Sequence, residues 1–478
     1  MKTQKIIFRY ICIYVVLLFP SIALANGNKI VGLTCENLQN PLGIESENPL
    51  LGWRFDPQKE ADLPSAFQII VSDNLEDIKN GKGNMWDSGK TISGETTQQK
   101  YNGERLKAQT RYFWCVRSYN NQGTASEWSE PAFFEMGIIH PSNWMAQWIE
   151  DGERRPRNIL DLYRNDAAPL LRKEWTIKKP IASARLYITA PVYYETYLNG
   201  QKVGDFVLTS GQASSPKTAL YNTFDVTALL KPGKNCWGIC LGHKTYETSF
   251  NELLHCFGGY QTGNRPSVYG QLIIRYTDGH LEYVLTDLTW KTIPGPIRQN
   301  SLYGGECYDA RAEVPGWNQP GAILYGWRNV SFANSPVKIL QPQMFPPLKG
   351  QKLIKPVGIS RAPSGGFIVD MGQNFTGIVQ LKIQGKRGTP ITFLYGEQIL
   401  PDGEVNASIS VVTEQKGNNS NSSPATVQQK DTYILRGEGK TESWHPRFTL
   451  HKFRYVEITG IEGELSPENI TGIVYSSD

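Results

Sequence analysis

The sequence lacks the short motifs that mark several common enzyme classes. It contains no H-E-x-x-H zinc motif, no G-x-S-x-G nucleophile motif, no Walker phosphate loop and no dinucleotide-binding glycine fingerprint. It also shows no series of amphipathic helix pairs. The residues therefore give no support for a zinc protease, an α/β-hydrolase, a P-loop NTPase or a nicotinamide-dependent enzyme.

Charge of one sign, long apolar runs and dense cysteines are also missing. With 49 basic and 45 acidic side chains, the net charge of +4 argues against nucleic acid or an anionic membrane surface as a partner. Beyond the N-terminus no run reaches the ~18 apolar residues of a membrane helix. The cysteines after residue 25 are too few for a disulfide scaffold, although one bridge could form in an oxidising compartment. They are Cys35, Cys115, Cys236, Cys240, Cys256 and Cys307.

The first 25 residues have the pattern of a secretory signal peptide. Lys2 and Lys5 give a basic start, residues 14–19 (YVVLLF) form an apolar centre, and residues 23–25 (ALA) fit a cleavage site. Cys12 lies within the apolar region and lacks the context of a lipid anchor. We expect a chain that begins at Asn26 and is exported to the periplasm or the extracellular space.

Aromatic residues, glycine and proline are abundant, and together they favour an all-β chain. The sequence has 12 Trp, 23 Tyr, 45 Gly and 29 Pro, which suit short strands joined by tight turns. The length of 478 residues agrees with about three domains. Aromatic side chains also stack on sugar rings, so the surplus fits both sandwich cores and carbohydrate contact.

Strand and turn patterns divide the chain into three consecutive β-sandwich domains. Residues 29–137 resemble a fibronectin type III domain, because large side chains alternate from Leu106 to Val116 and Tyr112 is placed like a tyrosine corner. Residues 165–340 predict a jelly-roll-like sandwich, with Asn199-Gly200 as a type I′ hairpin turn and residues 277–280 (TDGH) as the turn of a second hairpin. Residues 345–478 predict a third, larger sandwich.

Several motifs in register identify a family. They are D-T-Y-I-L-x-G from Asp431, W-x-P-R-F-T from Trp444 and F-R-Y-V-E-I-x-G from Phe453, preceded by G-Q-N-F-T-G from Gly372. Y-L-N-G from Tyr197, Y-N-T-F-D-V-T from Tyr221 and G-G-E-C-Y-D-A-R from Gly304 lie upstream. The whole set resembles the N-terminal accessory half of bacterial α-L-rhamnosidases of the glycoside hydrolase family 78 type. In that family the catalytic acids lie on an (α/α)6 barrel, which we expect to be absent from this chain.

The resemblance implies hydrolysis of terminal α-L-rhamnose from glycans or glycosides, represented here by the non-catalytic β-sandwich half. On this interpretation the chain alone is inactive, and whether to class it as an enzyme stays open. Two alternatives remain: a calcium-dependent rhamnose-binding or other carbohydrate-binding protein, and a scaffold for a separately encoded helical-barrel catalytic domain.

The candidate site residues are Asn199, Asp205 and Asp225, and no catalytic residue is assigned. Some relatives of the second domain bind L-rhamnose with Ca²⁺, which accepts oxygen ligands of this kind. The same three residues also fit purely structural roles in hairpins and turns. Glu306, Asp309 and Glu313 form a dense acidic group, for which a loop salt bridge with Arg311 is the competing interpretation.

Overall fold

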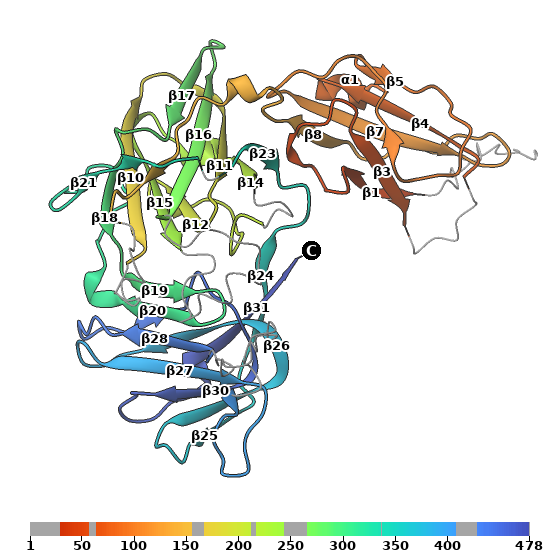
Figure 1. Ribbon diagram of the computed structural model, residues 1–478. Coiled ribbons are helices and arrows are strands. Elements are labelled where there is room, and N and C mark those ends of the chain that lie inside the picture. The colour runs from red at the N-terminus through yellow and green to blue at the C-terminus, as the bar shows by residue number, and fades with distance from the viewer. Residues whose placement is uncertain are drawn as a thin grey trace, which may run out of the picture. The chain divides into compact units, whose positions relative to one another are not determined.

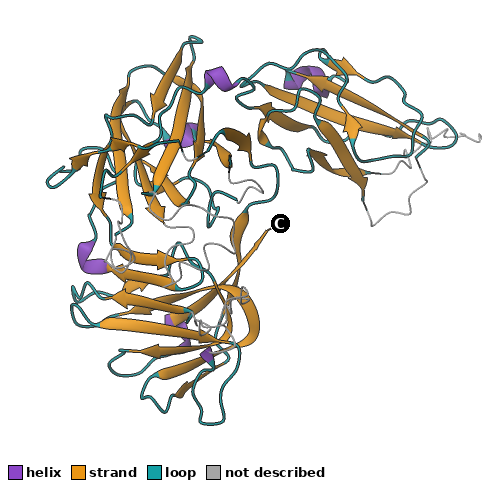
Figure 2. Ribbon diagram, viewed as in Figure 1, coloured by secondary structure: helices purple, strands orange, loops and turns teal. Residues whose placement is uncertain are grey.

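A computed structural model describes residues 29–56, 64–154, 167–211, 217–242, 265–335, 337–407 and 428–477. The signal peptide predicted at residues 1–25 lies outside these ranges. The described chain is almost entirely strand and loop, which confirms the all-β prediction (Figure 2). Its helical elements are the five-residue α1 (Leu75–Lys79) and 3-10 turns at Pro141–Asn143, Thr227–Leu229, Ala310–Ala312 and Pro467–Asn469. Within the described ranges no helix has the length and apolarity needed to cross a bilayer.

The chain divides into two compact units, and the division cuts through the first sandwich. The first unit holds the described residues of Met1–Cys35, Leu50–Arg105 and Tyr112–Phe133, and the second holds Glu36–Pro49, Leu106–Arg111 and Phe134–Asp478. Arg111 and Glu135 therefore belong to the second unit, although they stand on strands that continue into the first. Both side chains line a pocket of the second unit.

Two β-sheets, in which most paired strands are antiparallel, form the N-terminal immunoglobulin-like fold. Trp53 packs edge-to-face on Phe67 at 5.1 Å between ring centroids, and the alternation predicted after Leu106 is observed, with Tyr112, Trp114 and Val116 all buried. The first sheet has the order β1 (Ile30–Cys35), β3 (Leu50–Phe55), β6 (Gln99–Lys100). The second has the order β2 (Leu42–Ile44), β8 (Ala132–Met136), β7 (Arg111–Tyr119), β4 (Ala66–Ser72), β5 (Trp86–Asp87).

Two further sheets form the jelly-roll-like part of the second unit. Their facing sides bury a common apolar core in which Trp237 meets Trp290 at 4.9 Å. One sheet has the order β13 (Gln201–Lys202), β12 (Tyr193–Leu198), β15 (Gly233–Gly242), β10 (Pro169–Ile177), β18 (Lys291–Pro294), β21 (Arg328–Asn329). The other has the order β22 (Ser331–Phe332), β9 (Ile149–Glu150), β16 (Ser267–Tyr276), β11 (Ile181–Thr189), β14 (Thr218–Asp225), β23 (Ile339–Pro342), with β17 (Leu281–Leu285) on β16.

The hairpin predicted at Asn199-Gly200 is present. Leu198 pairs with Gln201 across the turn, and Asn199 and Gly200 both have positive φ, at 53° and 86°. A two-residue turn with two positive φ angles matches the right-handed twist of the strands it joins. The prediction of a second hairpin at residues 277–280 is also confirmed, since β16 and β17 pair antiparallel with Arg275 opposite Leu281.

A ten-stranded sheet forms the C-terminal part of the second unit. Its order is β19 (Ile297–Ser301), β20 (Gly305–Asp309), β28 (Lys430–Ile434), β27 (Pro390–Gly396), β30 (His451–Thr459), β26 (Phe367–Ile383), β31 (Ile470–Ser477), β24 (Leu348–Ile354), with β25 (Gly358–Arg361) and β29 (Glu442–Trp444) on β26. β20 pairs in parallel with β28, so residues 297–309 join this sheet rather than the jelly-roll sheets that precede them in sequence (Figure 1).

Candidate functional site

The structure places Asn199, Asp205 and Asp225 in three separate settings. The Asn199 side chain secures its own hairpin, because Oδ1 accepts from the Cys236 amide at 2.9 Å and Nδ2 donates to the Leu229 carbonyl at 2.8 Å. Asp205 is exposed and pairs with Lys349 at 3.0 Å. Asp225 lies at the end of β14 and pairs with Arg185 at 3.0 Å.

These three residues do not share one set of oxygens for a cation. Asn199 uses its only side-chain oxygen on a backbone amide, and both aspartates are neutralised by a basic side chain. Over the described ranges, no three His, Cys, Asp or Glu side chains lie close enough together to hold a metal ion. The residues present therefore do not fit a calcium site built from Asn199, Asp205 and Asp225.

Among the three predicted residues, Asp225 lines a described pocket. This pocket, called the guanidinium pocket below, has a volume of about 430 Å³. Its lining residues are Gln109, Arg111, Glu135, Ala182, Ser183, Arg185, Tyr187, Asp225, Thr227, Ile273, Arg275 and Leu281. All of them belong to the second unit.

The floor of the guanidinium pocket is one face of the sheet that contains β14, β11, β16 and β17. Arg185 on β11 stands opposite Asp225 on β14 and Ile273 on β16. Since side chains two residues apart on a strand share a face, Ser183, Arg185 and Tyr187 lie on the same side of β11. The sequence RLYIT at 185–189 was readable as a strand, and this alternation is the signal that could have grouped Arg185 with Tyr187.

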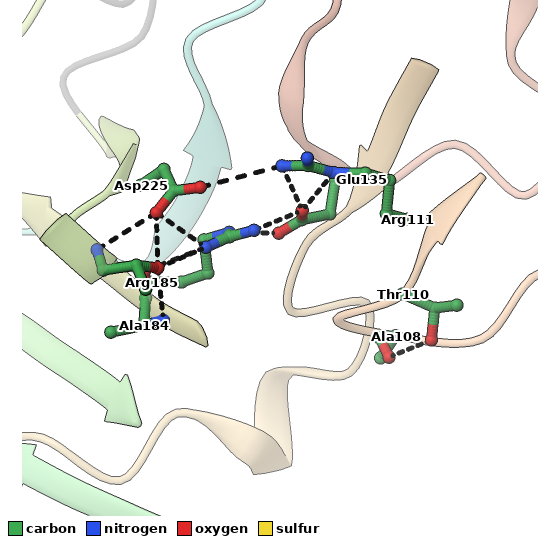
Figure 3. A network of polar contacts seen from close by, with 8 residues as sticks. Ala108, Thr110, Arg111, Glu135, Ala184, Arg185 and Asp225 are labelled. Carbon is green, nitrogen blue, oxygen red and sulfur yellow. Dashed lines mark hydrogen bonds and ion pairs between the residues drawn. The ribbon is translucent and has the colours of Figure 1, made fainter. Parts of the chain in front are cut away.

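Glu135 is the centre of an ion network in the pocket (Figure 3). Arg185 donates to it with Nε at 2.5 Å and Nη2 at 2.8 Å, and Arg111 donates through Nε at 3.1 Å. The Glu135 side chain is only 5% exposed, so two guanidinium groups compensate one buried carboxylate. Burial alone would lower the pKa of Arg185, but hydrogen bonds and charge from Glu135 outweigh it and raise that pKa above its usual value.

Asp225 completes the network on the side of β14. It pairs with Arg185 at 3.0 Å, lies 3.8 Å from Arg111, and accepts from the Thr227 amide and hydroxyl. Arg111, Glu135 and Arg185 were not identified from the sequence as site residues. They are up to 74 residues apart along the chain, and nothing in the local pattern indicates that they meet.

A second polar cluster is buried in the ten-stranded sheet. The Asp431 carboxylate accepts from the Tyr395 hydroxyl at 2.6 Å and from the Glu306 amide at 2.8 Å, and it contacts His451 Nε2 at 3.0 Å. Glu306 accepts from the Arg447 and Phe448 amides, both at 3.1 Å, through Oε2. Burial raises the pKa of Glu306 to about 8. The motifs around Asp431 thus hold the third sandwich together by a polar network inside it.

The other acids and thiols weighed from the sequence are accounted for by local partners. Asp309 is held by Arg311 at 2.8 Å, and Glu313 by Arg436 at 2.8 Å. Cys115, Cys236, Cys240 and Cys307 form no disulfide among the described residues, and Cys236 contacts the Arg172 guanidinium at 3.4 Å. Residues His243, His255 and Cys256 lie outside the described residues.

Three family models match the chain in order. The Rha78A-like N-terminal immunoglobulin domain matches residues 30–140, the alpha-L-rhamnosidase N-terminal domain matches 179–352, and the bacterial alpha-L-rhamnosidase concanavalin-like domain matches 360–476. These ranges follow the three-sandwich architecture described above.

Curated relatives and solved structures agree with the models. An alpha-L-rhamnosidase of Formosa agariphila is 31% identical over 459 residues, covering 92% of this chain and 47% of the relative. One of Streptomyces avermitilis is 26% identical and is covered to 57%. The structure of alpha-L-rhamnosidase from Dictyoglumus thermophilum superposes with a TM-score of 0.82 at 33% identity, covering 95% of this chain and 49% of that one.

The chain spans about half the length of the curated relatives it matches. The Streptomyces avermitilis alpha-L-rhamnosidase complexed with L-rhamnose superposes with a TM-score of 0.80 at 25% identity. The three domain models in register and these relatives show that the chain carries the immunoglobulin-like, N-terminal and concanavalin-like domains of the bacterial α-L-rhamnosidase type.

Proposed function

We propose that this chain is the non-catalytic β-sandwich part of an α-L-rhamnosidase-type glycoside hydrolase. The activity it serves is removal of terminal α-L-rhamnose from glycans or glycosides, and its partners are a rhamnose-containing carbohydrate and a helical-barrel catalytic domain. The observation that carries this proposal is the ordered match of three accessory-domain models to residues 30–476. An exported location fits a carbohydrate outside the cell.

We further propose that the chain alone does not hydrolyse rhamnosides. An inverting glycosidase needs two free carboxyl groups about 6.5–9.5 Å apart across a sugar cleft, one of them kept protonated. In the guanidinium pocket, Glu135 and Asp225 are both held by arginines. Glu306 has a raised pKa, but its side chain is buried and two backbone amides occupy one oxygen.

The test is turnover of 4-nitrophenyl α-L-rhamnoside by the purified chain. We expect no release of nitrophenol above the rate without protein. Turnover by the chain alone that disappears in the Glu306→Gln variant would overturn the proposal and point to that carboxyl group. Turnover that survives in this variant would also overturn it and point to another acid.

The same preparation can be titrated with L-rhamnose by calorimetry, with Ca²⁺ and then with a chelator. The proposal of an accessory part predicts the same heat under both conditions. Calcium-dependent heat that is lost in Asp205→Asn but kept in the control Asp278→Asn would favour the lectin-like alternative. Asp278 serves as the control because it is also an exposed aspartate paired with a lysine, at 2.7 Å.

A further inference from the structure

We propose that the guanidinium pocket binds a saccharide that carries an anionic substituent, with Arg275 holding the anion and the Tyr187 hydroxyl bonding to a sugar oxygen. The saccharide part of this inference rests on the proposed function, and the anion part rests on the pocket alone. Three observations carry it: an uncompensated guanidinium, an unpartnered buried hydroxyl, and the size and lining of the cavity.

Arg275 is the positive charge that the pocket leaves uncompensated. The lining has three guanidinium groups and two carboxylates, and both carboxylates are engaged by Arg111 and Arg185. Arg275 stands on β16 opposite Ser183, and no described residue forms an ion pair with it. A guanidinium offers a planar pair of donors that matches a carboxylate or a sulfate group.

Tyr187 supplies the second observation. Its side chain is fully buried, yet its hydroxyl finds no hydrogen-bond partner in the described part of the chain. Leaving a buried hydroxyl unsatisfied costs about 1–3 kcal/mol. Neighbouring buried tyrosines avoid this cost, since Tyr221 donates to Glu45 at 2.8 Å and Tyr194 donates to Asn222 at 2.7 Å. Tyr187 lines the pocket, so a ligand oxygen there would satisfy it.

The cavity suits a sugar in size and in the distribution of polar groups. Its volume of about 430 Å³ falls within the roughly 300–1,000 Å³ usual for small-molecule sites. The amide of Gln109 and the hydroxyl of Ser183 are available to ring hydroxyls, because neither side chain has a partner among the described residues. Ile273 and Leu281 give an apolar area on which the C–H face of a pyranose can pack.

The ligand test measures how tightly the full chain binds three sugars that differ only at carbon 6. Sodium D-glucuronate, D-glucose and D-glucose 6-sulfate are titrated by calorimetry at low and at high salt. We expect glucuronate or the sulfate ester to bind about tenfold more tightly than glucose, as a charge-assisted pair would provide, and this preference to shrink at high salt. The stronger of the two anionic sugars identifies whether the anion is a carboxylate or a sulfate.

Two variants connect the binding to the named side chains. Arg275→Gln should weaken binding of the anionic sugar about tenfold while leaving glucose binding and the melting temperature unchanged, because no described residue forms an ion pair with this arginine. Tyr187→Phe removes only the hydroxyl, so it should weaken binding several-fold without lowering the melting temperature. Arg361→Gln, in the third sandwich and paired with Glu464 at the surface, is the matched control and should bind normally.

Three results would overturn the proposal. They are equal affinity for glucuronate, its sulfate counterpart and glucose; binding of acetate as tight as that of glucuronate; and normal glucuronate binding by Arg275→Gln. The rhamnosidase-type function is tested separately by rhamnoside turnover, so failure of either proposal is recognisable without the other.

Discussion

In the second unit, a buried carboxylate is compensated by neighbouring arginine side chains. Glu135 is almost completely buried, yet Arg111 and Arg185 together satisfy both of its oxygens. Removing such a carboxylate lowers the stability of the fold, because the arginine charges that it compensated stay buried without an opposite charge. Exposed pairs such as Lys179–Asp278 have water as an alternative partner.

The contrast between the buried Glu135 network and an exposed ion pair predicts how substitutions change the free energy of unfolding. Glu135→Gln keeps the shape of the side chain but removes the charge that compensates two arginines, so we expect the free energy of unfolding to fall by about 3–5 kcal/mol. Urea unfolding followed by tryptophan fluorescence measures the change. Asp278→Asn is the control and should change the unfolding midpoint little. Equal midpoints for the two variants would show that the Glu135 network adds no stability.

Glu306 gives a prediction for pH. Burial raises its pKa from 4.5 to about 8, so between these values the folded chain keeps a proton that the unfolded chain has lost. The free energy of unfolding contributed by this group therefore falls as pH rises from 4.5 to about 8, with a slope of at most about 1.4 kcal/mol per pH unit. Above that range the contribution is constant.

Glu306→Gln cannot ionise and should lose this dependence. We expect the melting temperature of the wild type to fall relative to that of the variant as pH rises toward 8, and the two curves to run parallel at higher pH. Differential scanning calorimetry at a series of pH values measures it. Parallel curves over the whole range would mean that Glu306 titrates in the folded chain as it does in the unfolded chain.

At the scale of elements, the hairpin between β12 and β13 combines turn geometry with side-chain hydrogen bonds. Asn199 tolerates a positive φ of 53° and bonds to the Cys236 amide and to two oxygen atoms, on Leu229 and Asn235. Gly200 follows with a φ of 86°. The hairpin thereby ties β12 to the start of β15, which is the next strand in the same sheet.

Two substitutions at Asn199 separate these contributions. Asn199→Gly keeps access to positive φ but loses the hydrogen bonds, whereas Asn199→Ala loses both. We expect each to destabilise the second unit, the alanine variant by about 1 kcal/mol more, which is the usual cost of the left-handed region for a residue with a Cβ. Chemical denaturation compares them. An alanine variant as stable as the glycine variant would show that the turn relaxes out of its type I′ geometry.

At the scale of the whole molecule, the second unit is held together by strand pairing between segments that are distant in sequence. β20 pairs in parallel with β28 through Cys307 opposite Thr432. Glu306 on β20 also accepts from the amides of Arg447 and Phe448. The ten-stranded sheet therefore cannot be completed without residues 297–309, which lie about 120 residues before β28.

A substitution at Gly305 tests the pairing of β20 with β28. Its φ is 97°, and a Cβ there would lie 2.0 Å from the Lys430 carbonyl oxygen. Gly305→Ala should separate β20 from β28, so hydrogen exchange should accelerate in both strands. Gly279→Ala is the control, because its φ is 84° and a Cβ would meet no atom within 4 Å. Acceleration confined to residues 303–307 would show that β28 does not depend on β20.

The sequence by itself determined the all-β class, the two hairpins and the family, because these depend on local alternation, turn residues and motifs in register. Asn199-Gly200 and the strand around Phe453 are readable within a few residues of chain. Asn199 follows β12 and Asp225 ends β14, and these strands belong to two different sheets. This separation was not readable, since a motif does not state which side chains face each other.

Only the tertiary structure revealed which residues line the guanidinium pocket and that β20 pairs with β28. Both join residues separated by 50 or more positions, as Glu135 and Arg185 are. Such contacts depend on how complete sheets pack and on which faces remain uncovered. Local propensity carries no information on either, so the pocket could be found only after the fold was known.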